Sequence, residues 1–348
     1  MKRTILLLRI IMPIVAITCM VVFVPWILLR AWIVPLPDTI QEQANDAIEY
    51  GFDGIIVYVD EADKAPEFYT AGWKNRENKI PADPKALFKI ASISKLYIAA
   101  AVAKLANNKT LSLDKTLAEY LPELSKRIAN ADKITLRMLV QHRSGIPNFT
   151  DLSHYPWDNP IKDNKETLEL IYDLPADFEP NSDYSYSNTN YLLIGEILDQ
   201  SLGYSHHQYI HNEIVKPLGL SHTYSLLSEV NLDDVTSGYS VGYDKDIKTN
   251  DYVTPGGSMV ATIEDVGVFL RALNDGSLLN EEEQAIYSSI YVYEHTGLLP
   301  GYQSIARYYK DLDAVVIQFV NTSGENSWPL SEIVYNRIVK ILSNDERS

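Results

Sequence analysis

"FKIASISKLYIAAAVAKL", residues 88–105, is the stretch that decides how this chain of 348 residues folds. After Ser94 it is mostly apolar and rich in alanine, a composition typical of a helix that is buried on all sides. Ser92 and Lys95 stand at its start, three residues apart, so on a helix they share one face. Burying a lysine is costly unless its charge is paired or given up. The pattern therefore raises the question of what an amine does at the mouth of a buried helix.

The charge of the chain restricts its class of partner. The sequence has 30 Lys and Arg against 46 Asp and Glu, which gives a net charge of −16. Nucleic acid and anionic membrane surfaces would repel such a chain, so we expect neither to be its main partner. Small molecules and peptides remain as ligands. The length allows one large domain or two modest ones.

The first 37 residues differ in composition from the rest. Three basic residues precede the uncharged segment 10–29, whose twenty residues are enough for a helix across about 30 Å of hydrocarbon. The positive-inside rule then places the N-terminus in the cytoplasm. We predict a cytoplasmic tip and membrane anchor over residues 1–37 and one folded domain, outside the cytoplasm, over residues 38–348. A cleaved signal peptide is the alternative, but no small-x-small cleavage site follows the apolar core.

Both ends of the folded part carry strand patterns. "GIIVYVD" (54–60) and "EFYTAGW" (67–73) predict one hairpin, and "YQSIARYY" with "AVVIQFV" predicts another within 302–320. Apolar residues at helical spacing over 330–342 predict a C-terminal helix that packs on a sheet. The middle of the chain is mostly helical in pattern. We therefore predict an α+β fold in which both chain ends build one sheet, with an all-helical lobe inserted.

Ser92 and Lys95 could form a nucleophile and its base. Serine is a weak nucleophile until a neighbour takes its proton, and lysine can do so only if its pKa falls from about 10.4 toward neutrality. Burial in an apolar helix lowers a lysine pKa in that direction. The alternative is structural, with Ser92 capping an ordinary helix and Lys95 extending to water. Because Ser-x-x-Lys is common by chance, the pair alone does not decide.

Two further motifs follow in the order and rough spacing of a known superfamily. A Tyr-Ser-Asn triplet begins at Tyr186, and a His-Thr-Gly triplet begins at His295. Together with "FKIASISK" they resemble the three motifs of the serine β-lactamase and penicillin-binding protein superfamily. The closest resemblance is to the branch with class C β-lactamases, D-alanyl-D-alanine carboxypeptidases, D-aminopeptidases and esterases. Other segments also resemble that branch, namely 134–149, 215–223 and 254–274.

The resemblance implies an α/β sandwich with an antiparallel sheet, and a catalytic set. Ser92 would attack a carbonyl and become acylated, while Lys95 and Tyr186 would share the proton transfers. Asn188 would hydrogen-bond the lysine and the amide of the substrate. The backbone N–H groups of Ser92 and Leu298 would stabilise the oxyanion. The resemblance implies neither a metal nor an organic cofactor.

The His-Thr-Gly motif marks a departure from class C β-lactamases. We expect His295, Thr296 and Gly297 to line the substrate site together with Leu298. Class C enzymes usually have a lysine where this chain has His295, and a permanent cation there would attract a substrate carboxylate. Histidine, with a pKa near 6.5, is mostly neutral at pH 7. Recognition of a carboxylate is therefore expected to be weaker here or supplied by another group.

These features together predict a serine hydrolase that spans a bacterial cell membrane once and meets peptidoglycan-like peptides outside the cytoplasm. Activity like that of a D-alanyl-D-alanine carboxypeptidase, on peptides that contain D-amino acids, is the preferred prediction. A class C-like β-lactamase or an esterase is the alternative. An alternative of another class is a penicillin-binding sensor whose acyl-enzyme does not turn over.

Two weaker patterns compete with this interpretation. "GYSVG" (238–242) matches a nucleophile elbow around Ser240, but polar segments lie where a buried strand and a helix would be needed, so we expect a loop serine. His207 and His211 have i, i+4 spacing that could hold a metal, but no HExxH glutamate accompanies them. A solvated helix face is the preferred interpretation of these two histidines.

Overall fold

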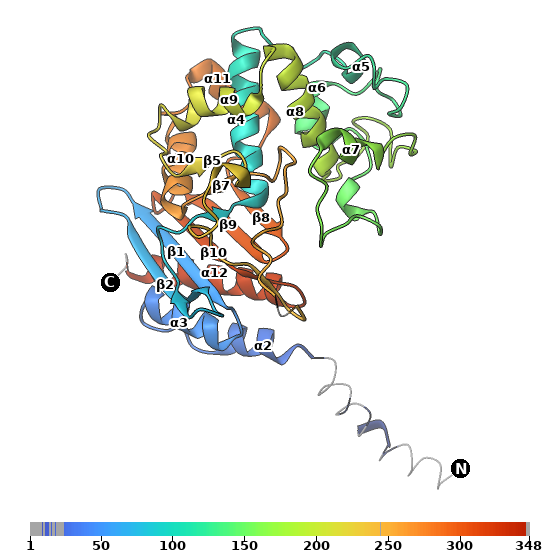
Figure 1. Cartoon of the computed structure of the whole chain (residues 1–348). Helices are drawn as coiled ribbons and strands as arrows, with labels where there is room; N and C mark the ends of the chain where they lie inside the picture. Colours follow the sequence, from blue (N-terminus) through green and yellow to red (C-terminus); the bar gives the residue numbers. More distant parts are fainter. Residues whose placement is uncertain are drawn as a thin grey trace.

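A six-stranded antiparallel sheet is the centre of the computed structural model, which describes residues 9, 11–13, 15, 18, 24–243 and 245–345. The strand order is β3-β2-β1-β10-β9-β8 (Figure 1). The bounds of these strands are Gly54–Glu61 (β1), Glu67–Asn75 (β2), Ile80–Pro81 (β3), His295–Leu299 (β8), Tyr302–Tyr309 (β9) and Ala314–Val320 (β10). Strands from opposite ends of the chain pair directly, because β1 lies between β2 and β10. The prediction that both chain ends build one sheet is confirmed.

Both faces of this sheet are covered, which explains its nearly continuous apolar strands. Side chains alternate along β1: Ile56 and Tyr58 join the core beneath the helical lobe, whereas Ile55, Val57 and Val59 face the opposite layer. That opposite layer consists of α2 (Trp26–Ile33), α3 (Ile40–Glu49) and α12 (Ser327–Asp345) (Figure 1). The helix α10 (Ile263–Asp275) packs on the lobe side of the sheet. The predicted C-terminal helix is thus present, and it packs on the sheet as expected.

The inserted lobe is mostly helical and lies beyond one face of the sheet (Figure 1). Its helices are α4 (Ser94–Asn107), α5 (Leu117–Tyr120), α6 (Leu136–Val140), α7 (Asn164–Glu169), α8 (Asn188–Leu202), α9 (His206–Ile210) and α11 (Glu281–Ile290). The expectation of an all-helical lobe needs one correction. Strands of two residues form a small sheet in the order β4-β7-β5, over Phe88–Lys89, Val260–Ala261 and Thr223–Tyr224. These strands are too short to show alternation, so the sequence could not reveal them.

The helix α4 is buried as its composition predicts. Its residues from Ser94 to Ala103 are all buried, and the ring of Tyr97 stacks on Phe269 of α10 with 3.6 Å between centroids. Alanine at the crowded positions lets neighbouring helices approach closely, and it costs little side-chain entropy in a helix. The lobe and the sheet therefore meet around α4, and its first turn is held rigidly.

The predicted membrane location is wrong on the evidence of the structure. In the part of the chain that the structure describes, no helix is both long enough and apolar enough to cross a bilayer. The helix α2 has eight residues and contains Arg30, so it spans about 12 Å, less than half of the hydrocarbon core. Part of segment 10–29, on which the anchor was predicted, lies outside the described residues, namely 10, 14, 16–17 and 19–23. The domain boundary at residue 37 stays a prediction.

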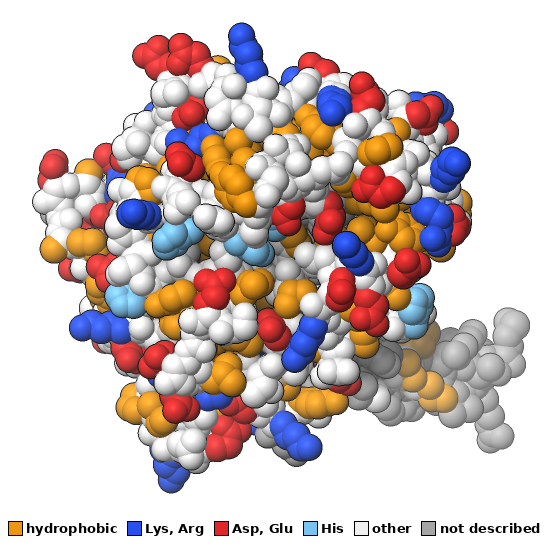
Figure 2. Space-filling view, turned by 45° about the horizontal axis from the view of Figure 1, so that its top comes forward, with side chains coloured by type: hydrophobic (Ala, Val, Ile, Leu, Met, Phe, Trp, Pro, Cys, Tyr) orange, Lys and Arg blue, Asp and Glu red, His pale blue; other side chains and the backbone are white. Residues whose placement is uncertain are grey.

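Charged groups of both signs are spread over the surface. On the face drawn in Figure 2, Asp and Glu side chains lie among Lys and Arg side chains, without a continuous basic surface on that face. Binding to nucleic acid usually requires such a surface. The expectation that nucleic acid is not a partner stays a prediction.

Candidate active site

Ser92 lies in a short 3₁₀ turn, Ala91–Ile93, that leads directly into α4. The residue before it, Ala91, has a φ of 52°, in the left-handed region that residues with a Cβ rarely adopt. Such a conformation persists only where the surroundings enforce it. Here it turns the chain sharply from β4 into α4, and Ser92 stands partly exposed at the mouth of the helix.

Lys95 lies one turn later and is fully buried. Its Nζ is 2.8 Å from Oδ1 of Asn188, 2.7 Å from the carbonyl oxygen of Gly256, and 3.1 Å from Oγ of Ser92. Burial lowers the pKa of this lysine to about 7. A neutral amine has two N–H groups and one lone pair. Two neighbours are oxygens that can only accept, so the lone pair is left to face the Ser92 hydroxyl.

Gly256 was not singled out by sequence reasoning, yet its position explains how Lys95 is held. A Cβ atom on this glycine would stand 2.9 Å from Nζ of Lys95. Only a residue without a side chain lets the backbone carbonyl come this close to the amine. The sequence held one signal, since Gly256 lies in segment 254–274, which resembles the known branch.

Tyr186 and Asn188 enter the site at the start of α8. The hydroxyl of Tyr186 donates to Oγ of Ser92 at 2.8 Å, and burial raises the pKa of this tyrosine above its ordinary value. Buried His142 supports the segment, because its Nδ1 accepts the backbone N–H of Ser187 at 3.1 Å. The ring of His142 also stacks on that of Tyr186, with centroids 4.5 Å apart. Sequence reasoning gave this histidine no role.

The His-Thr-Gly motif forms β8, the edge strand of the main sheet. Its residues lie beside the turn that holds Ser92, and Gly297 is where the two segments come closest. A Cβ atom on Gly297 would collide with the backbone oxygen of Ile90. A side chain at this position would push β8 away from Ser92. The edge strand therefore brings its unpaired backbone groups next to the serine, as an oxyanion site requires.

His295 is neutral and fully occupied by neighbours. Its Nδ1 donates to the carbonyl oxygen of Thr296, which leaves Nε2 to accept the hydroxyl hydrogen of Tyr291 at 2.8 Å. Burial, together with the nearby charge of Lys95, lowers the pKa of His295 to about 4. The ring therefore carries no positive charge near neutral pH. A substrate carboxylate would find no cation at the position where class C enzymes usually have one.

A cleft of about 680 Å³ joins these residues. Of the eight residues singled out from the sequence, Ser92, Tyr186, Asn188, His295, Thr296 and Leu298 line it. The other two, Lys95 and Gly297, lie directly behind this lining. The structure thus brings all eight together, while their catalytic and binding roles stay predictions. Ser240, which sequence reasoning had set aside, also lines the cleft. Lining residues that sequence reasoning did not single out are Asn148, Thr150, Asp151, Trp157, Leu299, Pro300, Ser323, Gly324 and Trp328.

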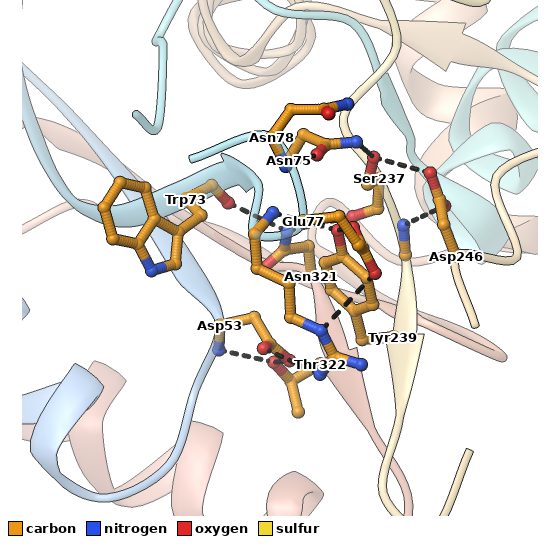
Figure 3. A network of polar contacts seen from close by, with 12 residues as sticks. Asp53, Trp73, Asn75, Glu77, Asn78, Ser237, Tyr239, Asp246, Asn321 and Thr322 are labelled. Carbon is orange, nitrogen blue, oxygen red and sulfur yellow. Dashed lines mark hydrogen bonds and ion pairs between the residues drawn. The ribbon is translucent and has the colours of Figure 1, made fainter. Parts of the chain in front are cut away.

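One wall of the cleft is built by two serines on a pair of short parallel strands. Ser240 of β6 (Tyr239–Ser240) lies opposite Ser323 of β11 (Thr322–Ser323). Figure 3 shows the polar network behind this wall, in which Asn321 donates to the carbonyl oxygens of Trp73 and Ser237. Ser240 was expected in a loop and lies instead in this short strand. Its surroundings are not a strand-turn-helix elbow, so the nucleophile-elbow pattern around it is accidental.

The histidine pair expected on a solvated helix face lies in α9 and the π-helical turn after it. His211 is exposed, whereas His207 is partly buried and its ring lies 4.0 Å from that of His206. His206 in turn contacts Asp199 at 2.7 Å. Within the described residues, no group of three or more His, Cys, Asp or Glu side chains is placed to hold a metal ion.

Comparisons with known proteins agree with this geometry. The family model described as "Beta-lactamase" matches residues 30–290. "Penicillin-binding protein 4*" of Bacillus subtilis is 27% identical over 190 residues, and "Protein flp" of Staphylococcus aureus is 26% identical over 208 residues. These matches cover 54% and 58% of this chain but only 41% of each relative, so the chain spans about two fifths of the length of these relatives.

Solved structures with the same fold cover nearly the whole chain. A D-amino acid amidase from Ochrobactrum anthropi SV3, in complex with L-phenylalanine amide, has a TM-score of 0.78 at 23% identity, covering 89% of this chain and 98% of its own. A penicillin-binding protein from Bacillus halodurans has a TM-score of 0.74 at 20% identity, with coverages of 87% and 99%. At these identities the likeness establishes the fold.

Proposed function

Because this chain belongs to the beta-lactamase family, we propose that it is a serine hydrolase that forms an acyl-enzyme on Ser92. Its proposed substrates are peptides or amides that contain a D-amino acid. The observation that carries the proposal is the pair of contacts at one oxygen: Oγ of Ser92 lies 3.1 Å from Nζ of Lys95 and 2.8 Å from the hydroxyl of Tyr186. A serine between a base and a proton donor is what acyl transfer requires.

In the proposed acylation step, Ser92 loses its proton to Lys95 as its Oγ bonds to the substrate carbonyl carbon. A pKa of about 7 leaves about half of this lysine neutral at pH 7, so it is available as a base without being too weak to accept the proton. The negative charge that develops on the carbonyl oxygen would be held by the backbone N–H groups of Ser92 and Leu298. These donors are backbone groups and do not depend on the side chains at the two positions.

Tyr186 is the proposed donor to the leaving group. Its raised pKa keeps the phenol protonated, and its hydroxyl already donates to Oγ of Ser92. When the C–N bond breaks, the phenol would pass a proton to the departing amine and recover one from Lys95. Water would then attack the ester on Ser92, with its proton taken along the same path in reverse. The products are a free acid and an amine, and Ser92 is regenerated.

The proposed substrate class draws on similarity and on charge. The solved neighbours include a D-amino acid amidase and a D-stereospecific amidohydrolase. The carboxypeptidase activity predicted from the sequence needs a cation for the terminal carboxylate, and His295 is neutral. We therefore favour amide and peptide substrates whose recognition does not depend on a carboxylate.

The test compares hydrolysis of D-phenylalanine 4-nitroanilide, its L-enantiomer and nitrocefin by the purified full chain and by Ser92→Ala. We expect release of nitroaniline from the D-substrate, at least tenfold slower release from the L-enantiomer, and loss of both in Ser92→Ala. Equal rates for the two enantiomers would contradict the substrate class. Activity that survives in Ser92→Ala would contradict the nucleophile. Rapid turnover of nitrocefin alone would favour the β-lactamase alternative.

A further inference from the structure

The charges that line the cleft are unusual for a site that would bind an anionic substrate. Among the lining residues in the described part of the chain there is no lysine or arginine. His295 is neutral, and Lys95 lies behind Ser92 with its N–H groups directed at two carbonyl oxygens. The lining does contain one carboxylate, Asp151, which is exposed and has no ion pair within the described structure. The fixed charge of the open cleft is therefore negative.

Asp151 is held in a defined place relative to the candidate catalytic residues. It ends the 3₁₀ turn η2 (Phe149–Asp151), whose Phe149 is buried in the core. Two residues beside it bind Asn188: Oδ1 of Asn148 accepts the backbone N–H of Asn188 at 2.9 Å, and Nδ2 of Asn188 donates to Oγ1 of Thr150 at 3.1 Å. Because Asn188 also contacts Lys95, the turn that presents the carboxylate is tied directly to the site of chemistry.

The rest of the lining suits an apolar side chain. Trp157 and Trp328 contribute to the cleft together with Leu298, a residue that is 54% exposed. Trp157 is held by an edge-to-face contact with Tyr155, with 4.8 Å between the ring centroids. An exposed leucine and two indole rings offer a large apolar surface next to a single carboxylate. This combination matches an amino acid that carries a free ammonium group and a bulky apolar side chain.

We propose that Asp151 binds the protonated α-amine of the substrate's acyl part, so that the preferred substrates are aminoacyl amides or peptides with a free amino terminus and a large apolar side chain. This inference rests on the proposed serine hydrolase function and narrows its substrate class. It assigns Asp151 as a specificity residue that the sequence motifs do not include. A carboxylate paired with an ammonium in a cleft recognises it through a charge-assisted hydrogen bond.

A second cavity supplies the competing hypothesis. It has a volume of about 320 Å³ and is lined by Arg143, while Tyr186 and His295 line both this cavity and the main cleft. Arg143 has no ion pair within the described residues. If a substrate carboxylate extended from the main cleft past the rings of Tyr186 and His295, Arg143 would bind it. Substrates with a terminal carboxylate would then be preferred. This outcome is distinguishable by experiment.

The experiment measures kcat/KM for D-phenylalanine 4-nitroanilide and for its N-acetyl derivative, in which an acetyl group replaces the charge of the α-nitrogen; the effect of its added bulk is common to wild type and variant. We expect wild type to prefer the free amine, and Asp151→Asn to lower the ratio of the two kcat/KM values about 10- to 100-fold through KM. The control is Asp63→Asn, the same change of charge on the exposed turn between β1 and β2, which should leave the ratio unchanged. Raising the salt concentration should reduce the wild-type preference.

Three outcomes would overturn the inference while leaving the proposed function intact. The first is Ser92-dependent hydrolysis of both substrates with a ratio that Asp151→Asn does not change. The second is a preference for a peptide with a terminal carboxylate that Arg143→Gln abolishes. The third is loss of activity toward both substrates in Asp151→Asn with an unchanged melting temperature, which would assign the residue to catalysis. Hydrolysis that persists in Ser92→Ala would instead refute the proposed function.

Discussion

The protonation state of Lys95 should set how the enzyme depends on pH, and this can be tested by adding one charge. Lys95 must be neutral to take the proton of Ser92, and its pKa is about 7. The value of kcat/KM should therefore fall about tenfold for each pH unit well below 7 and level off above it. Other groups near Ser92 do not titrate in this range, since His295 has a pKa of about 4 and Tyr186 is raised above its ordinary value.

Replacing Asn188 with aspartate puts a carboxylate where Oδ1 now lies, 2.8 Å from the lysine nitrogen. At an effective dielectric constant near 20, the attraction at that distance is about 6 kcal/mol, and desolvation of the new carboxylate offsets part of it. We expect the pKa of Lys95 to rise by roughly 1 to 3 units, as opposite charges at close range usually cause. The apparent pKa of the acidic limb in the pH profile of kcat/KM should therefore rise from about 7 to between about 8 and 10.

The assay is kcat/KM for N-acetyl-D-phenylalanine 4-nitroanilide from pH 5 to 10, because this substrate does not titrate in that range. The shift also separates Lys95 from Lys89, whose pKa burial likewise lowers to about 7. Lys89 donates to the carbonyl oxygens of Lys248 and Asn250, so a change at Asn188 should not affect it. An apparent pKa of the acidic limb that stays near 7 in the folded Asn188→Asp variant would refute the role of Lys95 as the base.

Three further predictions concern single side chains. Tyr186→Phe should lower kcat for the anilide about 10²- to 10⁴-fold but lower kcat for an activated ester less, because an ester leaving group of low pKa needs no proton. Equal losses on both substrates would contradict the role of Tyr186 as a proton donor. Gly256→Ala places a methyl group 2.9 Å from Nζ of Lys95, so kcat/KM should fall about 10- to 100-fold. An unchanged kcat/KM would show that the amine of Lys95 need not be held in this position. Phe319→Ala removes a buried ring that stacks on Phe88 with 4.5 Å between the centroids. In urea unfolding, the free energy of unfolding should fall by about 3 to 5 kcal/mol. A fall of less than about 1 kcal/mol would mean that neighbouring side chains fill the cavity.

The parts of the fold with a strong local pattern could be predicted from the sequence. The apolar run after Ser94 predicted a buried helix, and the runs in β1 and β10 predicted strands, because burial on one or both faces imposes a recognisable composition. That both chain ends share one sheet was inferred from strand patterns at opposite ends of a helical middle, but the direct pairing of β1 with β10 was not predicted. The two-residue strands that build the small sheet and the Ser240–Ser323 wall carry no such pattern.

The candidate site divides in the same way. Ser92, Lys95 and Tyr186 were recognised because they lie in motifs with fixed spacing. Asp151 and Trp328 were not, because they reach the cleft through tertiary packing and have no motif around them. Gly256 was predictable only in part. Its segment resembled the known branch, but nothing in the sequence indicated that its carbonyl contacts Lys95. The membrane prediction relied on the length, apolar composition and flanking charges of segment 10–29, and α2, which overlaps the end of that segment, is too short to span a bilayer.

Intact-mass spectrometry of the full chain, incubated with a fluorescent penicillin and separately with an activated ester, tests the acyl-enzyme most directly. The proposed mechanism predicts one added acyl group on the wild type and on Ser240→Ala, which changes a second serine of the cleft lining, and none on Ser92→Ala. Loss of the adduct within minutes would indicate a hydrolase, whereas persistence for hours would favour the sensor alternative. An adduct that remains in Ser92→Ala, or none on folded wild type with either reagent, would contradict the mechanism.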